Sequence, residues 1–190
     1  MLGANGARGL SHPKVDQRAG VPDGTTSFYF RTRKALIQGI AERLTELDLA
    51  DLLLLTSLAD DDASGYAGTA GLATLVMFAN TEPYLTRSRA RYELTLHLSR
   101  EPELGETLSH FVTQFYALAR NVIREWHAAD SESNEPVIDE QADMLLTFIN
   151  GVMMSFVSGT PVVRDAEHLQ RWLEAILAGA TATREPRPDA

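Results

Sequence analysis

A short run near the start of the chain, residues 25–34, combines hydroxyl, aromatic and basic side chains. Small hydroxyl groups bond bases or phosphates at close approach, while tyrosine, arginine and lysine bind phosphate oxygens. These types in this order indicate a surface that contacts DNA. The candidate residues, in chain order, are Thr25, Thr26, Ser27, Tyr29, Arg33 and Lys34.

Two short helices joined by a turn are predicted to position these side chains. The first spans residues 11–18 and the second residues 22–30, with Gly20 supplying the tight backbone between them. Thr32 is predicted to cap a longer helix that runs to about Leu49 or beyond. This is the layout of a helix-turn-helix followed by a linker helix.

The rest of the chain also has helical periodicity, so the predicted fold class is all-α. The polar runs at 60–65 and 129–136 predict loops, and the tail from residue 181 carries no core residues. Further helices are predicted over residues 66–79, 84–98, 104–128, 138–158 and 165–178.

Charge is divided unevenly along the chain, which has a net charge of −9. Residues 1–44 carry seven Lys or Arg and three Asp or Glu, whereas residues 45–190 carry ten Lys or Arg and 23 Asp or Glu. A basic block on an acidic body attracts a polyanion to one end and repels it elsewhere.

Signatures of other functions are missing from the sequence. There is no cysteine, no two histidines have i,i+4 spacing, and no catalytic or phosphate-loop motif occurs. We expect no catalysis, metal or cofactor; an all-helical enzyme is an alternative that only turnover would support. Because no apolar run approaches the roughly 20 residues that span a bilayer, we expect a cytoplasmic protein without membrane contact.

The segment from residue 6 to residue 36 resembles the DNA-binding region of the TetR family of bacterial transcriptional regulators. The resemblance implies a helix-turn-helix domain at 1–44 and an effector-binding and dimerisation bundle at 45–190. Residues 1–5 resemble only the end of the family's first helix, and we hypothesise that the native chain starts upstream. The matching motifs are Ala19-Gly20-Val21, Gly24-Thr25, Tyr29-Phe30 and Thr32-Arg33.

The resemblance also implies roles for individual residues at the DNA. Thr25, Thr26 and Ser27 would approach bases or phosphates, and Tyr29 a phosphate. Arg33 and Lys34 would bind the DNA backbone from the start of the long helix, and Ser11 and Lys14 from the preceding helix. Phe28 and Phe30 are expected inside the domain. Two departures from the family pattern are Ser27, where a bulkier residue is common, and the acidic Asp23.

By the same analogy, the second domain holds a small, mostly apolar effector. For any single lining candidate, an ordinary core residue is the favoured alternative. The run from Arg87 to Arg91 could bind an acidic ligand group, or form a solvated face paired with Glu82 and Glu93. The lining candidates are Phe78, Tyr92, Phe111, Phe115, Tyr116 and Phe148.

The predicted helix 138–158 is apolar around most of its circumference, so it must be covered on two sides. We expect a homodimer formed through this helix and 165–178; a central helix in a monomeric bundle is the alternative. The resulting prediction is a ligand-responsive repressor that binds a near-palindromic operator. The alternative is a relative that has lost DNA binding and serves as a dimeric small-molecule or protein-binding module.

Overall fold

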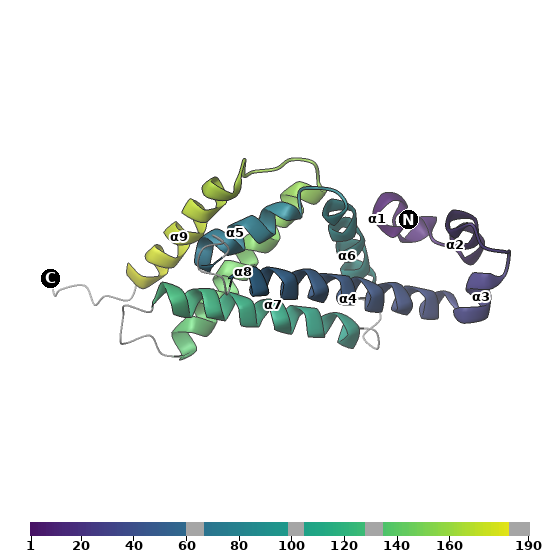
Figure 1. Ribbon diagram of the computed structural model, residues 1–190, viewed down its shortest axis with the longest axis horizontal. Helices are drawn as coiled ribbons and strands as arrows, with labels where there is room; N and C mark the ends of the chain where they lie inside the picture. The colour runs from purple at the N-terminus through teal and green to yellow at the C-terminus, as the bar shows by residue number, and fades with distance from the viewer. Residues whose placement is uncertain (60–66, 99–104, 128–134, 183–190) are drawn as a thin grey trace. The chain divides into compact units, whose positions relative to one another are not determined.

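The computed structural model describes residues 1–59, 67–98, 105–127 and 135–182, and every regular element in them is a helix (Figure 1). The all-α prediction is confirmed. The predicted loop at 60–65 lies outside the described residues, as do most of the predicted loop at 129–136 and most of the tail from residue 181. The elements are α1 (Leu2–Asn5), η1 (Ala7–Gly9), α2 (His12–Ala19), α3 (Thr25–Tyr29), α4 (Arg33–Ala59), α5 (Gly68–Phe78), α6 (Tyr84–Leu98), α7 (Gly105–Trp126), α8 (Glu135–Val157) and α9 (Ala166–Ala182).

The chain divides into two compact units that are not contiguous in sequence. The first contains Met1–Leu52 and Glu82–Thr113, and the second contains Leu53–Thr81 and Gln114–Ala190. The first unit therefore includes α6 as well as the N-terminal helices. The functional boundary predicted at residue 44 stays a prediction.

The core of the first unit joins α1, α4 and α6. Val15 and Phe30 pack against its edge. A Cβ added to Gly3 of α1 would lie 2.2 Å from the backbone oxygen of Thr86 in α6, so these two helices are in backbone contact. Helix α6 is thus an integral part of this unit. The buried core residues are Leu2, Leu10, Leu36, Ile37, Ala41, Leu44, Ala90 and Leu94.

Two ion pairs also fasten α6 to α4. Arg91 bonds Asp48 through both Nε, at 2.9 Å, and Nη2, at 2.5 Å, and the Asp48 side chain is only 8% exposed. One turn away, Nη1 of Arg87 lies 2.7 Å from Asp51. The expectation that these arginines pair with Glu82 and Glu93 on a solvated face is wrong, because they turn inward to α4.

The second unit is built on contacts of α9 with α5 and α8. Thr69 of α5 donates its hydroxyl to Glu174 of α9 at 3.0 Å, and a buried His127–Gln141 pair at 2.8 Å links the end of α7 to α8. Within the described part of the chain, no helix combines the length and apolarity needed to cross a bilayer. The fully buried side chains of the second unit include Leu145, Ile149, Phe156, Leu169, Leu173 and Leu177.

Candidate nucleic-acid interface

Helix α3 begins at Thr25, three residues later than predicted. Gly24, directly before it, has a left-handed backbone with φ of 89°. The carbonyl of Pro22 accepts bonds from the Thr25 amide at 3.1 Å and from its hydroxyl at 2.6 Å. Because these bonds close a turn over 22–25, Pro22 and Asp23 belong to the turn and not to the helix.

A carboxylate on α2 caps the start of α3. Asp16 is 1% exposed and accepts the backbone amides of Gly24 at 2.8 Å and Thr26 at 2.7 Å. It also accepts the Thr26 hydroxyl at 2.5 Å. The hydroxyl bond, followed by the amide bonds, lowers the pKa of Asp16, against the opposing effect of burial. Asp16 was not predicted from the sequence, because its partners Gly24 and Thr26 lie eight and ten residues further along the chain.

The other end of α3 is also held. His12 of α2 donates Nε2–H to the Phe30 carbonyl at 2.6 Å. The Phe30 ring lies against α4, where a Cβ on Gly39 would approach its Cε1 atom to 2.4 Å. The prediction that Phe30 packs inside the domain is confirmed. Bonds from α2 and packing on α4 therefore set the orientation of α3.

The outward surface of α3 consists of Ser27, Phe28 and Tyr29, all exposed. Phe28 is 77% exposed and Tyr29 is 72% exposed, with their rings edge to face at 5.2 Å between centroids. The expectation that Phe28 is a core residue is wrong. The inward positions of this short helix are occupied by Thr26 and Phe30, which leaves Phe28 on the solvent side.

The two threonines of α3 differ from the prediction. Thr26 is 6% exposed and its hydroxyl is bonded to Asp16, so a DNA contact from Thr26 conflicts with its placement. Thr25 is half-buried and bonded to the turn. Of Thr25, Thr26 and Ser27, only Ser27 is exposed.

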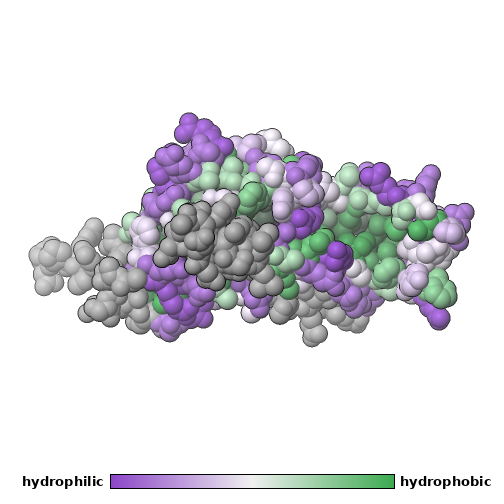
Figure 2. Space-filling model, viewed as in Figure 1, coloured by the Kyte–Doolittle hydropathy of each residue, from purple (hydrophilic) through white to green (hydrophobic). Residues whose placement is uncertain are grey.

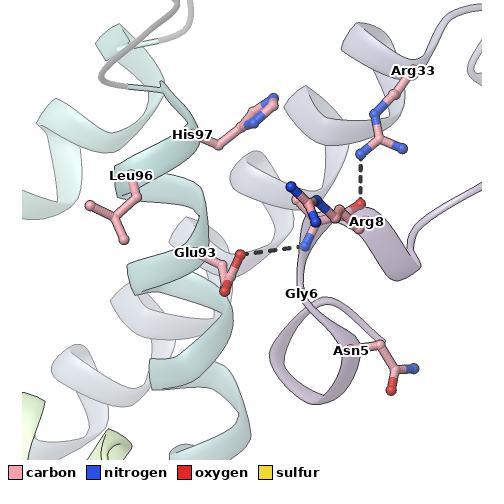
Figure 3. Close-up of a pocket in the computed structure, with 8 residues that line it drawn as sticks. Asn5, Gly6, Arg8, Arg33, Glu93, Leu96 and His97 are labelled. Atoms are coloured by element: carbon pink, nitrogen blue, oxygen red, sulfur yellow. Dashed lines mark hydrogen bonds between the residues drawn. The ribbon is translucent and has the colours of Figure 1, made fainter.

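Arg33 holds the turn that precedes α2. Its Nη1 atom donates to the Leu10 carbonyl at 2.5 Å, and its Nη2 atom donates to the Ala7 carbonyl at 2.6 Å. Figure 3 shows the second of these bonds. From α6, Glu93 accepts the Ala7 amide at 3.4 Å, beside a cavity of about 470 Å³. Helices α4 and α6 thus both bind the η1 turn. This geometry favours a positioning role for Arg33 over the predicted phosphate contact.

Exposed cations flank the helix-turn-helix. Lys14 of α2 and Lys34 of α4, the predicted phosphate contacts, are exposed. Arg31 and Arg18 are exposed as well, and Arg18 was not among the predicted residues. Ser11 stands at the start of α2 and is half-buried. Figure 2 shows hydrophobic and hydrophilic surface interleaved over these N-terminal helices.

The predicted effector-lining residues are distributed over both units. Tyr92 belongs to the first unit, where burial raises the pKa of its hydroxyl. Tyr116 donates its hydroxyl to the Asp139 carbonyl at 3.2 Å, and Phe148 meets Trp172 at 6.0 Å between ring centroids. The side chain of Phe111 lies outside what the structure describes. Phe78, Phe115, Tyr116 and Phe148 are all half-buried residues of the second unit.

Helices α8 and α9 each bury one side and expose a stripe at helical spacing. The exposed side chains are small or are large and apolar, and a Cβ on Gly151 would meet no atom within 4 Å. Such stripes allow two helices to approach closely. Their members are Met144, Thr147, Gly151 and Met154 on α8, and Trp172, Ala175 and Gly179 on α9.

Comparison with solved structures finds the same fold in proteins that include the following two. The crystal structure of the multidrug binding protein EbrR complexed with proflavin has a TM-score of 0.60 at 21% identity, covering 92% of each chain. A putative TetR-family transcriptional regulator from Rhodococcus sp. has a TM-score of 0.59 at 16% identity, covering 97% of this chain and 92% of that one.

No curated protein matches the chain. The family model described as "Tetracyclin repressor-like, C-terminal domain" matches residues 63–182. That match takes in most of the sequence and lies outside the helix-turn-helix segment, so it is independent of the N-terminal motifs. The chain therefore belongs to the tetracyclin repressor-like, or TetR, family of transcriptional regulators.

Proposed function

We propose that this protein is a homodimeric, ligand-responsive repressor that binds a near-palindromic operator through α3. The observation that carries the proposal is the fixed presentation of α3. Asp16 and His12 bind its two ends, and Ser27, Phe28 and Tyr29 face outward. A helix held in this way can enter the major groove without reorganising.

Phosphate contacts would set the register of the protein on the duplex. Lys14, Lys34, Arg31 and the Tyr29 hydroxyl are exposed around α3 and are the proposed contacts, with Ser27 and Thr25 at the helix itself. Ser11 is proposed as a further contact at the start of α2. The basic N-terminal block supports this arrangement, because the rest of the chain repels DNA.

Coupling to an effector would pass through α6. This helix contacts α1 through Gly3, α4 through two ion pairs, and the η1 turn through Glu93. A displacement of α6 would therefore shift the helix-turn-helix as one body. An effector that binds one position of α6 more tightly changes the population of the DNA-binding geometry.

The dimer would form through the exposed stripes of α8 and α9. Two copies of each helix placed together bury Met144, Met154 and Trp172, which the single chain leaves 43%, 44% and 37% exposed. Burial of such side chains is the dominant favourable term in association. A two-fold dimer would carry two helix-turn-helix motifs, one for each half-site.

The effector is proposed to be small and mostly apolar. The aromatic residues Phe78, Phe115, Tyr116 and Phe148 of the second unit support this chemistry. A structural neighbour, EbrR, was solved with proflavin, which makes proflavin a direct probe. Its fluorescence on titration with this protein would report binding. The proposed cellular location is the cytoplasm, where operator and effector meet.

The function is tested by measuring binding to duplexes that carry the promoter of the protein's own gene, over a range of salt concentrations. We expect nanomolar-range binding that weakens steeply with salt. Lys14→Ala should weaken binding to every sequence and lower the salt slope by about one. Arg164→Ala, an exposed cation of the second unit, is the matched control and should change neither.

Two outcomes would contradict this proposal. Absence of duplex binding even at low salt, together with proflavin binding, would identify a ligand-binding module without DNA activity. A salt slope that stays the same in Lys14→Ala would remove the phosphate role of α2.

A further inference from the structure

We propose that Phe28 recognises the C5-methyl group of thymine in the major groove and so determines part of the operator sequence. The inference rests on the proposed DNA-binding function and assigns specificity to one side chain of the same surface. It concerns a residue that sequence patterns place in the core and that the structure places on the outside.

The position of Phe28 is fixed by its surroundings. Its amide donates to the Gly24 carbonyl at 2.9 Å, inside a helix that Asp16 holds at the start and His12 at the end. The Tyr29 ring meets the Phe28 ring at an interplanar angle of 87°. With 77% of its surface exposed, the phenyl ring is presented to whatever α3 contacts.

The chemistry of a phenyl ring limits what it can recognise. It carries neither a hydrogen-bond donor nor an acceptor, so it cannot read the polar pattern of base edges. The one apolar group among those edge features is the thymine methyl, and phenylalanine is a known type of partner for it. Neighbouring Ser27 and Tyr29 carry hydroxyls, which leaves Phe28 as the apolar reader of α3.

Charge around Phe28 supports DNA as the occupant of this surface over an apolar protein partner. Lys14, Arg18 and Arg31 are exposed on the same small helix-turn-helix. An apolar partner gains nothing from these cations, whereas a duplex presents phosphates to them and methyl groups to Phe28 at once.

The test combines a protein variant with a change of a single methyl group in DNA. A duplex is selected from a random library by the wild-type protein, and each enriched thymine is then replaced by deoxyuridine, which lacks the methyl. We expect the wild type to lose about fourfold in affinity at the contacted position, the value of one buried methyl group. Phe28→Ala should bind the thymine and deoxyuridine duplexes equally.

Two further variants serve as controls. Phe28→Leu keeps an apolar contact and should still discriminate thymine from deoxyuridine. Tyr29→Phe loses a phosphate contact and should bind both duplexes more weakly, with their ratio unchanged. Phe28→Ala should keep the melting temperature of the wild type, because the ring is exposed.

The outcomes separate the inference from the proposed function. If the wild type enriches a sequence but Phe28→Ala shows the same loss on deoxyuridine, Phe28 does not read the methyl and the inference is overturned alone. If the wild type enriches a sequence but binds its thymine and deoxyuridine forms equally well, the inference is again overturned and the proposed function stands. If the wild type binds no duplex at low salt, the proposed function fails and the inference with it.

Discussion

Asp16 organises the DNA-facing helix from a neighbouring element. Helix α3 lacks a capping side chain of its own, because the residue before it is Gly24. Asp16 supplies the acceptor instead, and it satisfies two amides and one hydroxyl at once. The same carboxylate therefore contributes to the stability of the first unit and to the orientation of the exposed surface of α3.

We expect Asp16→Asn to lower both the melting temperature and the affinity for operator DNA. Asparagine presents an amide group to at least one of the donors that Asp16 now accepts, which leaves that donor unpaired in a buried site. Thermal denaturation and fluorescence anisotropy measure the two effects. Asp23→Asn, an exposed acid of the adjacent turn, is the control and should leave the melting temperature unchanged.

The stabilisation by Asp16 should also depend on pH. Its pKa is lower in the folded chain than the ordinary value of 3.8, so the folded state binds a proton less readily than the unfolded state does. The stabilisation by Asp16 is complete above pH 3.8, the ordinary pKa of the carboxyl group. It is lost as the pH falls through the lower pKa that this group has in the folded chain. The difference in melting temperature between wild type and Asp16→Asn should therefore shrink below pH 4; a constant difference down to pH 3 would contradict this.

Single-residue predictions from the sequence succeeded where local geometry decides and failed where tertiary contacts decide. Gly20 is left-handed at the predicted turn, and Thr32 accepts the Ala35 amide at 3.0 Å at the predicted cap. Phe28 and Thr26 exchanged their expected environments, since a five-residue helix buries only the side that faces Asp16. Nothing in a linear pattern shows which side that is.

At the scale of elements, α6 is the helix whose position was hardest to foresee. Its bounds, Tyr84–Leu98, match the prediction at both ends. Its place in the first unit depends on Gly3 and Ala90, small residues that allow close approach but give no periodic signal. The inward direction of Arg87 and Arg91 likewise follows from acids 36 and 43 residues earlier in the chain.

We expect Gly3→Val to destabilise the first unit by about 1–3 kcal/mol, the usual cost of overpacking. Any Cβ at this position collides with the Thr86 oxygen, so α1 must move away from α6. Chemical denaturation measures the change in the free energy of unfolding. Ala4→Val, on the exposed side of the same helix, is the control and should change it by less than about 0.5 kcal/mol.

Asp48→Ala breaks the Arg91–Asp48 pair and should lower the free energy of unfolding, measured by chemical denaturation, by about 2 kcal/mol. This is somewhat less than the roughly 3–5 kcal/mol lost when a fully buried pair is broken. The cost arises because Arg91 is left in a site where its side chain is only 19% exposed. The exposed Arg43–Glu46 pair offers a comparison within α4, with both side chains about two-thirds exposed. Arg43→Ala should change stability by less than about 0.5 kcal/mol; equal losses in the two variants would contradict the assignment.

At the scale of the whole molecule, the proposed function depends on two chains. The exposed stripes of α8 and α9 are the surface that a second copy would cover. Gly151 lies in the middle of the α8 stripe, and a Cβ there would meet no atom of its own chain within 4 Å.

We therefore expect Gly151→Arg to convert the protein from dimer to monomer, as measured by analytical ultracentrifugation. In a lone chain the substitution has room and removes a helix-destabilising glycine, a gain of up to about 1 kcal/mol. Ala178→Arg, exposed on α9 outside the stripe, should remain dimeric. A Gly151→Arg protein that stays dimeric would place the interface elsewhere.

The inclusion of α6 in the first unit has a consequence for synthesis on the ribosome. The N-terminal helices are synthesised before Ala90 and Leu94, which complete their core. At roughly 5–20 residues per second, the stretch between Leu52 and Leu98 takes about 2–10 s to make. During that interval Leu2, Leu36 and Leu44 lack their covering helix, so the nascent chain is a natural client for chaperones that bind exposed apolar segments.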